Sequence, residues 1–394
     1  MEAAGRVLAK PLRASTAVPP FARAAMDGFA VRARDTFGAA PTNPLALRVT
    51  GESRVGRVPE RRVVLGCCHR IATGAPMPRG ADAVVMFEHC RELRGGLVEV
   101  EVAATPSENV GAKGEDVRAG EVLLGAGNDL LAHDIAIAAA LGLRRLSVAR
   151  RPRVGVLSTG NELQRPGRRL RAGEIHDANR PGALAAVALA GGAAVDLGIA
   201  CDTLGAVRSR IAAGLRRCDA VVVSGGSSAG ARDFAPEAVA SLGRPGVLIH
   251  GVAMRPGYPV GLGAVGRKPV VLLPGSPVAA ALCVEEFVLP ALRKMLGTGE
   301  KRLPRGALVR ARAARRIPGA PGLTTFARVV LVERRGGLAA DPLRTSGSGI
   351  LSSLVRGSGL VVIPSSKEGI EEGEEVTVRL LRPRASGPDW DGGG

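Results

Sequence analysis

The chain has 394 residues, of which 46% are hydrophobic but only 2% aromatic, and its formal net charge is +18. This composition excludes general disorder, because enough apolar side chains are present to build sizeable cores. The scarcity of aromatic residues argues against sites for single-stranded nucleic acid, which stack bases on aromatic rings. The basic balance favours acidic partners such as nucleic acid, anionic lipid or a polyanionic small molecule, and a solvated arginine-rich surface explains it equally well.

The cysteines predict reduced thiols in a cytoplasmic protein, because none of them forms a CxxC pair and no disulfide framework is apparent. They are Cys67, Cys68, Cys90, Cys201, Cys218 and Cys283. The N-terminus has no apolar signal-peptide region, and no stretch reaches the ~18 uninterrupted apolar residues of a membrane span. We therefore expect neither a membrane nor a secretory route.

The N-terminal part of the chain reads as two pieces. Short alternating apolar runs separated by turn residues predict a β-rich domain over 21–104. Residues 1–20 and 105–147 form an elongated linker domain, in which LLAHDIAIAAALGL has helical spacing and ends at Gly142.

The pattern changes after RRPR, where apolar strands alternate with helical stretches from 148 to 298. Such alternation predicts a doubly wound α/β domain with a parallel-rich sheet and helices on both faces. Strands dominate again over 302–382, which predicts a C-terminal β domain resembling a barrel. The polar, glycine-rich residues 383–394 are expected to be a disordered tail.

Three loops of small residues leave strand ends of the α/β domain, and ligands of open α/β sheets bind at such ends. The loops are STGNEL (158–163), SGGSSAGARDF (224–234) and LPGSPVAA (273–280). Small residues let backbone N–H groups approach a ligand, and the helix that follows adds partial positive charge. One such loop is also explained by a tight connection, but three on one edge predict a site for a phosphorylated or otherwise anionic ligand.

Acidic residues accompany these loops: Glu162 lies in the first, Asp233 in the second, and Asp202 follows the strand that ends at Ala200. Carboxylates beside a phosphate repel it unless a divalent cation lies between, and Mg²⁺ takes one or two carboxylates together with phosphate oxygens. Helix capping is the alternative role for Glu162 or Asp233 taken singly.

The order of motifs resembles the molybdopterin molybdenumtransferase family, which includes MoeA-type proteins and the gephyrin E domain. The motifs are AMDGFAV, RIATGAPMPRGADAVV, GEDVRAG, VGVLSTGNELQRPG, GEIHDANR, VVVSGGSSAGARDF, VAMRPGYPVGLG and LLPGSPVAA. The resemblance covers about 5–382 and implies a multi-domain homodimer with a MoaB/Mog-like central domain. It also implies that residues 1–20 and 105–147 form an elongated linker and dimerisation domain, from which about one helix is missing before Gly5, so we expect this domain to be truncated at its start. It further implies an enzyme that binds adenylylated molybdopterin with Mg²⁺, inserts molybdate at the dithiolene and releases AMP, with a molybdopterin adenylyltransferase as a partner and no nucleic acid.

The resemblance also implies roles for individual residues, matched motif by motif. Glu162 and Asp233 fall on the positions that hold the divalent metal against the nucleotide. The implied catalytic, cleft-lining residues are Asp27, Thr73, Asp116, Glu162, Asp202 and Asp233. The implied substrate-binding residues are Ser224, Gly225, Gly226, Ser227, Arg255, Pro274, Gly275, Ser276, Pro277 and Ser348.

The sequence departs from the family pattern in GVAMRPGYP, where Gly251 and Tyr258 stand at positions that are commonly lysine, while Arg255 keeps its charge. FARAAMDG also lacks the Asn and Ser that usually precede Asp27. Loss of two cations weakens binding of phosphate or molybdate, because neither Tyr nor Gly carries charge at pH 7. Two hypotheses follow: an active molybdenum insertase, and a diverged paralogue that binds molybdopterin or a nucleotide as a scaffold or regulator. A nucleic-acid-binding protein is a third hypothesis that rests on charge alone.

Overall fold

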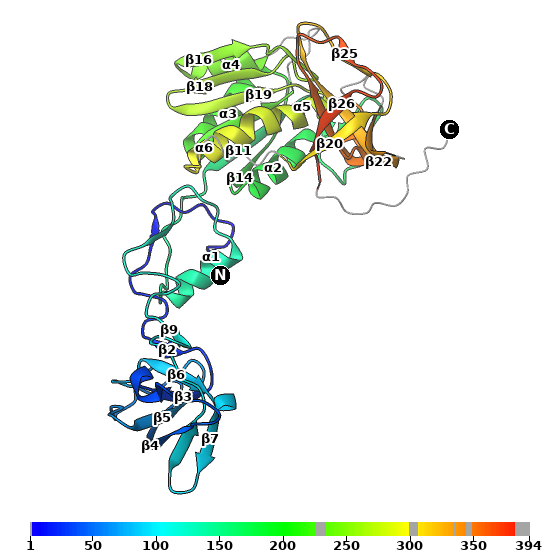
Figure 1. Ribbon diagram of the computed structural model, residues 1–394. Coiled ribbons are helices and arrows are strands. Elements are labelled where there is room, and N and C mark those ends of the chain that lie inside the picture. The colour runs from blue at the N-terminus through cyan, green and yellow to red at the C-terminus, as the bar shows by residue number, and fades with distance from the viewer. Residues whose placement is uncertain (1, 226–233, 299–305, 335, 344–348, 383–394) are drawn as a thin grey trace. The chain divides into compact units, whose positions relative to one another are not determined.

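The computed structural model describes residues 2–225, 234–298, 306–334, 336–343 and 349–382. The chain divides into two compact units, Met1–Val148 and Ala149–Gly394, whose elements are shown in Figure 1. Within the described residues, every helix is too short or too polar to cross a lipid bilayer.

The first unit contains a six-stranded mixed sheet in the order β6-β3-β5-β4-β8-β7. The strands are β3 (Gly28–Val31), β4 (Leu45–Ser53), β5 (Cys67–Ile71), β6 (Ala83–Met86), β7 (Cys90–Leu93) and β8 (Leu97–Val100), with short 3₁₀ turns η1 (Ala33–Thr36) and η2 (Phe87–His89). Alternate residues of these strands bury one apolar face, as the period of two requires. The Phe29 and Phe87 rings meet edge to face in this core, with 5.3 Å between their centroids.

The rest of the first unit is built from two-stranded pairs and one helix. β1 (Leu12–Arg13) pairs with β10 (Val122–Leu124), β2 (Arg23–Ala24) pairs with β9 (Val110–Gly111), and α1 spans Ala132–Ala140. The Leu131 N–H donates to the Asp134 carboxylate at 2.8 Å and so closes the first turn of α1. Leu8, Leu130 and Ala138 bury the apolar face of this part.

The second unit begins with a six-stranded sheet in the order β14-β11-β15-β19-β18-β16. Its strands are β11 (Arg153–Thr159), β14 (Ala193–Ala200), β15 (Ala220–Ser224), β16 (Pro245–His250), β18 (Gly261–Val265) and β19 (Lys268–Leu273). The first four strands of that order are parallel to one another, and β18 runs antiparallel to both of its neighbours, β19 and β16. A small parallel pair, β12 (Leu163–Gln164) and β13 (Ile175–His176), lies in the connection after β11.

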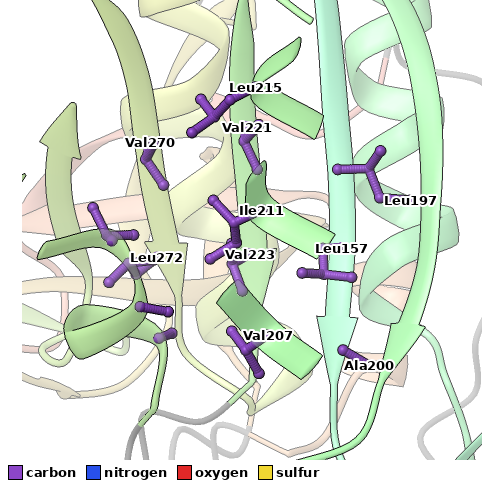
Figure 2. Packing of buried hydrophobic residues seen from close by; sticks show 13 residues of the cluster. Leu157, Leu197, Ala200, Val207, Ile211, Leu215, Val221, Val223, Val270 and Leu272 are labelled. Carbon is purple, nitrogen blue, oxygen red and sulfur yellow. The ribbon is translucent and has the colours of Figure 1, made fainter. Parts of the chain in front are cut away.

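Helices cover both faces of this sheet. α3 (Leu204–Arg217) and α4 (Phe234–Leu242) pack on one face, and α2 (Asn179–Leu189) packs with α5 (Pro277–Cys283) and α6 (Leu289–Met295) on the other (Figure 1). Figure 2 shows the core beneath α3, where Val207, Ile211 and Leu215 meet alternate residues of β11, β15 and β19. At roughly 1.5–3 kcal/mol for each large apolar side chain, this core is a main source of stability.

The helical run predicted over SPVAAALCVEEFVLPALRKML is interrupted. A π-helical turn, η3 (Val284–Val288), separates α5 from α6. Pro290 lies in the first turn of α6 and has no N–H to donate, so the i→i−4 bonding pattern cannot continue through it.

The chain ends in a closed five-stranded barrel. The strands β20 (Leu308–Ala313), β22 (Thr324–Arg334), β23 (Gly337–Pro342), β24 (Gly359–Ile363) and β26 (Glu375–Leu380) pair in a ring because β22 contacts both β23 and β24. β21 (Ile317–Pro318) pairs with β25 (Gly369–Ile370), and α7 spans Ser352–Arg356.

One expected strand is divided between two sheets. The sequence GVLIHGVAM predicts a single strand, but β16 ends at His250, and β17 (Met254–Arg255) pairs in parallel with β22 of the barrel. β17 thus carries Arg255 into the barrel sheet. The Tyr258 carbonyl accepts a bond from the Val252 N–H at 2.9 Å, which closes the loop around it.

Candidate functional site

The candidate site of the second unit lies where β11, β15 and β19 end together. In the register of the sheet, Ser158 stands opposite Ser224, and Ser224 stands opposite Leu273. The three small-residue loops predicted from the sequence therefore leave one edge. The described part of this edge includes the buried Ser224 and Pro274.

The backbones of the first and second loops come close together at Gly225. Its φ is +101°, and a Cβ there would lie 2.3 Å from the Thr159 carbonyl oxygen. Gly275 is its neighbour from the third loop, because a Cβ on Gly275 would stand 3.8 Å from the Gly225 Cα. Only glycine fits at 225. The close approach leaves a rim of backbone at the start of α5. Ser276 is the N-cap residue of this helix and Pro277 is its first residue.

Asn179 joins these loops, although the sequence analysis did not select it. Its side-chain amide donates to the Ser224 Oγ at 2.9 Å and to the Gly275 carbonyl oxygen at 2.8 Å. Asn179 is the first residue of α2, so one helix fixes the second and third loops relative to each other. The signal was present in GEIHDANR, where a polar residue precedes an apolar helix, but periodicity does not say which atoms it binds.

A buried polar network lies beneath the rim and was also missed. The Arg180 Nε donates to Asp177 at 2.9 Å, its Nη1 donates to Asp196, and the Ser158 Oγ donates to Asp177 at 3.0 Å. Burial alone would raise the pKa of the Asp196 carboxyl, but the bonds from the Gly198 N–H and Arg180 outweigh burial and lower that pKa. The network fixes β11, β14 and α2 at the end of the sheet that carries the loops.

The two described acidic candidates, Glu162 and Asp202, follow neighbouring parallel strands. The exposed Glu162 comes three residues after the end of β11, and the half-buried Asp202 comes two residues after the end of β14. Asn161 links their segments, because its N–H donates to Asp202 Oδ2 at 3.4 Å and its Oδ1 accepts the Asp202 N–H at 3.1 Å.

This donor set fits Mg²⁺, since carboxylate oxygens are the ligands that the ion prefers, and exposed carboxylates can turn toward it. Of the other candidates, Gly226, Ser227, Asp233 and Ser348 lie outside the described residues. A meeting of Glu162 with Asp233 therefore stays a prediction. Over the part of the chain that the structure describes, no three His, Cys, Asp or Glu residues group as a metal site.

A cavity with two arginines in its lining lies where β17 pairs with β22 of the barrel. Arg255 and Arg328 line a cavity of about 70 Å³ together with Thr325 and Phe326 of β22. Arg328 is only 2% exposed, and burial lowers the pKa of its guanidinium. The family resemblance implied a role for Arg255 but not for Arg328, because an arginine within a β-strand of the barrel gives no pattern that distinguishes it from a surface residue.

Gly251 and Tyr258, at which the resemblance implies lysines, lie close together in the structure. Tyr258 is 58% exposed, and its ring lies 3.6 Å from the place where a Cβ on Gly251 would stand. The phenol therefore covers the space into which a side chain at position 251 would project. The two uncharged residues are neighbours in space, so both losses of charge fall at one place.

In the first unit, two of the predicted residues meet directly. The Asp27 carboxylate accepts bonds from the Thr73 N–H at 2.7 Å and the Thr73 Oγ1 at 3.0 Å. Asp27, Thr73 and Asp116 are all exposed, as residues that meet a ligand must be. Asp116 lies in a turn in which its N–H donates to the Val18 carbonyl oxygen at 3.1 Å.

The fold and these features define a multi-domain protein whose doubly wound domain brings three small-residue loops to one sheet edge and whose barrel adds a cavity lined by two arginines. Three family models match in chain order: the MoeA N-terminal region (domain I and II) over 1–142, a probable molybdopterin binding domain over 155–294, and the MoeA C-terminal region (domain IV) over 310–381.

Whole-length relatives agree with these matches. The chain is 36% identical over 386 residues to molybdopterin molybdenumtransferase 2 of Mycobacterium tuberculosis, covering 96% of this chain and 93% of the relative. It is 31% identical over 388 residues to molybdopterin molybdenumtransferase of Bacillus subtilis, covering 98% and 89%. A crystal structure of the molybdopterin biosynthesis MoeA protein from Pyrococcus horikoshii matches with a TM-score of 0.83 and 34% identity, covering 97% of this chain and 93% of that one.

The chain belongs to the molybdopterin molybdenumtransferase family. The family and the multi-domain fold predicted from the sequence are thereby confirmed.

Proposed function

We propose that this chain is the transferase of molybdenum cofactor biosynthesis that inserts molybdate into the dithiolene of adenylylated molybdopterin, with Mg²⁺-dependent release of AMP. Support comes from relatives named molybdopterin molybdenumtransferase that align over nearly the whole chain. The observation that carries the proposal is the rim formed by Gly225, Gly275 and Asn179, because it leaves backbone groups at a strand edge where an anionic ligand binds.

At this rim we assign the adenylylated pterin to the loops that follow β15 and β19. Gly225 and Ser276 offer backbone and hydroxyl groups to the phosphates, and the buried Ser224 supports the rim through its bond with Asn179. Glu162 and Asp233 would hold Mg²⁺, and the ion would neutralise phosphate charge next to the departing AMP. Asp202 positions the Glu162 segment through Asn161.

The cavity between Arg255 and Arg328 suits molybdate, which is a dianion. Two guanidinium groups lining a small, partly buried space attract an oxyanion more strongly than they would in bulk water, because the local dielectric constant is lower. Ser348, which the resemblance places at the same cleft, is a further proposed contact.

The decisive assay follows AMP released from adenylylated molybdopterin, with and without molybdate, in Mg²⁺ and in EDTA. We expect release that needs both molybdate and Mg²⁺, and a loss of at least about tenfold in Glu162→Gln if that residue binds the metal. Glu237→Gln on α4 is the matched control, because Glu237 is an exposed glutamate of the same unit. Absence of molybdate-dependent release from folded protein contradicts the proposal.

One observation favours a second candidate, a paralogue that binds the pterin or a nucleotide without catalysis. Gly251 and Tyr258 place two neutral residues next to each other where the family commonly has lysines. Under this alternative, AMP and adenylylated molybdopterin bind with ordinary affinity while molybdate produces no turnover. Restoring one cation with Tyr258→Lys separates the two candidates, since it raises turnover only if the rest of the site is competent.

The surroundings of the enzyme are also proposals. We propose a homodimer, whose mass light scattering would give. We also propose that a molybdopterin adenylyltransferase supplies the substrate, which fits the family. A cytoplasmic location fits the six cysteines, which are all free thiols.

A further inference from the structure

A cavity of about 430 Å³ in the first unit is lined by three arginines, Arg32, Arg34 and Arg62. The exposed Val64 adds apolar surface to it, Val63 is buried behind it, and Asp82 also belongs to its lining. None of these residues takes part in the site proposed above. Three like charges around one cavity repel one another, so their grouping needs either neighbouring acids or a bound anion.

The nearby acids are engaged with the backbone. The Asp82 carboxylate accepts the Ala33 N–H at 2.7 Å, and the Asp35 carboxylate accepts the Gly66 N–H at 3.1 Å. Asp35 also faces two of the arginines, but at 3.6 Å from Arg32 Nε and 3.9 Å from Arg34 Nε. These distances exceed the ~2.7–2.9 Å of a charge-assisted hydrogen bond, so Asp35 leaves guanidinium N–H groups available.

Arg32 shows this directly. Its side chain is only 14% exposed, and its Nη2 is buried with no hydrogen bond to any described residue. A buried guanidinium nitrogen without an acceptor is costly, and an unfilled anion site is one of the few explanations for it. Arg32 therefore has one guanidinium nitrogen that no described residue satisfies, although Asp82 belongs to the same lining.

The wall is held in place by a close approach at Gly80. A Cβ on Gly80 would lie 2.3 Å from the Val63 carbonyl oxygen and 3.1 Å from the Arg62 Cγ. The Arg62 side chain therefore passes directly over Gly80, which any larger residue would prevent. Arg62 is thus oriented by packing, unlike a freely solvated arginine.

We propose that this cavity binds the phosphate group of a small soluble phosphomonoester. Three guanidinium groups match the three terminal oxygens and the double charge of such a group, whereas a carboxylate has one charge and is satisfied by one arginine. Its lining, which lies wholly within described residues, contains no aromatic ring to stack a nucleobase. Recognition therefore rests on the phosphate, with the exposed Val64 beside an aliphatic or sugar portion.

The test is calorimetric titration of the full chain with inorganic phosphate and with glycerol 3-phosphate, at constant ionic strength kept with chloride. We expect saturable binding that Arg62→Gln and Arg32→Gln each weaken about tenfold, the effect of losing one charged hydrogen bond. Arg94→Gln, in the turn between β7 and β8, is the matched control and should bind as the parent does. Arg62 is exposed, so Arg62→Gln keeps the test valid if Arg32→Gln fails to fold.

Absence of saturable binding overturns the proposal, and so does equal affinity in Arg62→Gln and the parent. A lipid phosphate is the competing source, and sedimentation with phosphatidylcholine vesicles containing phosphatidate distinguishes it. Vesicle binding that Arg62→Gln abolishes, in protein that does not bind glycerol 3-phosphate, contradicts the soluble ligand. The test is independent of AMP release, because neither arginine belongs to the proposed insertion site.

Discussion

Replacing Arg180 with methionine tests the buried network beneath the candidate site. Methionine keeps much of the side-chain length but removes the charge and both donors. The Arg180 and Asp177 side chains are 5% and 1% exposed, so the change leaves a buried carboxylate that keeps only the bonds from Ser158 Oγ and the backbone N–H of residue 180. Breaking a buried ion pair in this way costs about 3–5 kcal/mol, a large part of the ~5–15 kcal/mol that stabilises a typical domain.

Urea titration followed by circular dichroism at pH 7 measures this loss. The matched control is Arg150→Met, because Arg150 pairs with Asp219 at 2.8 Å while its side chain is 70% exposed. An exposed pair of this kind contributes less than about 1 kcal/mol. If Arg180→Met costs no more than Arg150→Met, the network is not a determinant of stability and the reasoning is refuted.

The difference in stability between the parent protein and Arg180→Met should also depend on pH. The pKa of Asp196 is lowered in the folded state, so its contribution to stability is present above its unfolded value of about 3.9 and is lost as pH falls through the folded value. Removing Arg180 takes away one of the hydrogen bonds that lower the pKa of Asp196, so the variant has less stability to lose on acidification. The stability difference between the parent and Arg180→Met should therefore be largest near neutral pH and shrink as the pH falls toward about 4. A constant difference contradicts this.

Three further outcomes are expected. Gly225→Ala should lower the melting temperature, because the positive φ alone costs about 1–3 kcal/mol and the added Cβ meets the carbonyl at the end of β11. Gly205→Ala, where nothing lies within 4 Å of the added Cβ, should be neutral or stabilising. Asp27→Ala should reduce AMP release while the melting temperature stays within a few degrees, since the bonded Thr73 is exposed to water and can be solvated. A large drop in the melting temperature would instead indicate a structural role for Asp27. In timed alkylation followed by mass spectrometry, the exposed Cys201 should react before three buried or half-buried thiols, because burial raises their pKa to about 12. Simultaneous labelling contradicts this. Those slow thiols are Cys68, Cys90 and Cys283.

The sequence predicts most of the architecture because many of its strands have a recognisable local composition. β11, β15 and β19 are short runs of valine and leucine between turn residues, and such runs are typical of buried parallel strands. Among the strands that were not predicted are β18 with the sequence GLGAV and β23 with the sequence GLAADP. Both contain few β-branched residues, so they form through pairing with their neighbours instead of through local preference.

The candidate site is predicted less completely than the fold. Glycine and acidic residues at strand ends stand out, because turn chemistry and charge are local properties of the sequence. Asn179, Arg180 and Arg328 do not stand out, since their importance arises from contacts with residues far away along the chain. A helix or strand pattern places such a residue on an element but does not reveal its partner.

The ring that covers Gly251 also makes the protein observable. Tyr258 is the single tyrosine of the chain, and the single tryptophan, Trp390, belongs to the tail outside the described residues. Replacing Trp390 with phenylalanine would leave one fluorophore three residues from Arg255, the cation that lines the cavity between β17 and the barrel. Arrival of an oxyanion at that cavity could then be followed in real time by intrinsic tyrosine emission, without a label and without turnover.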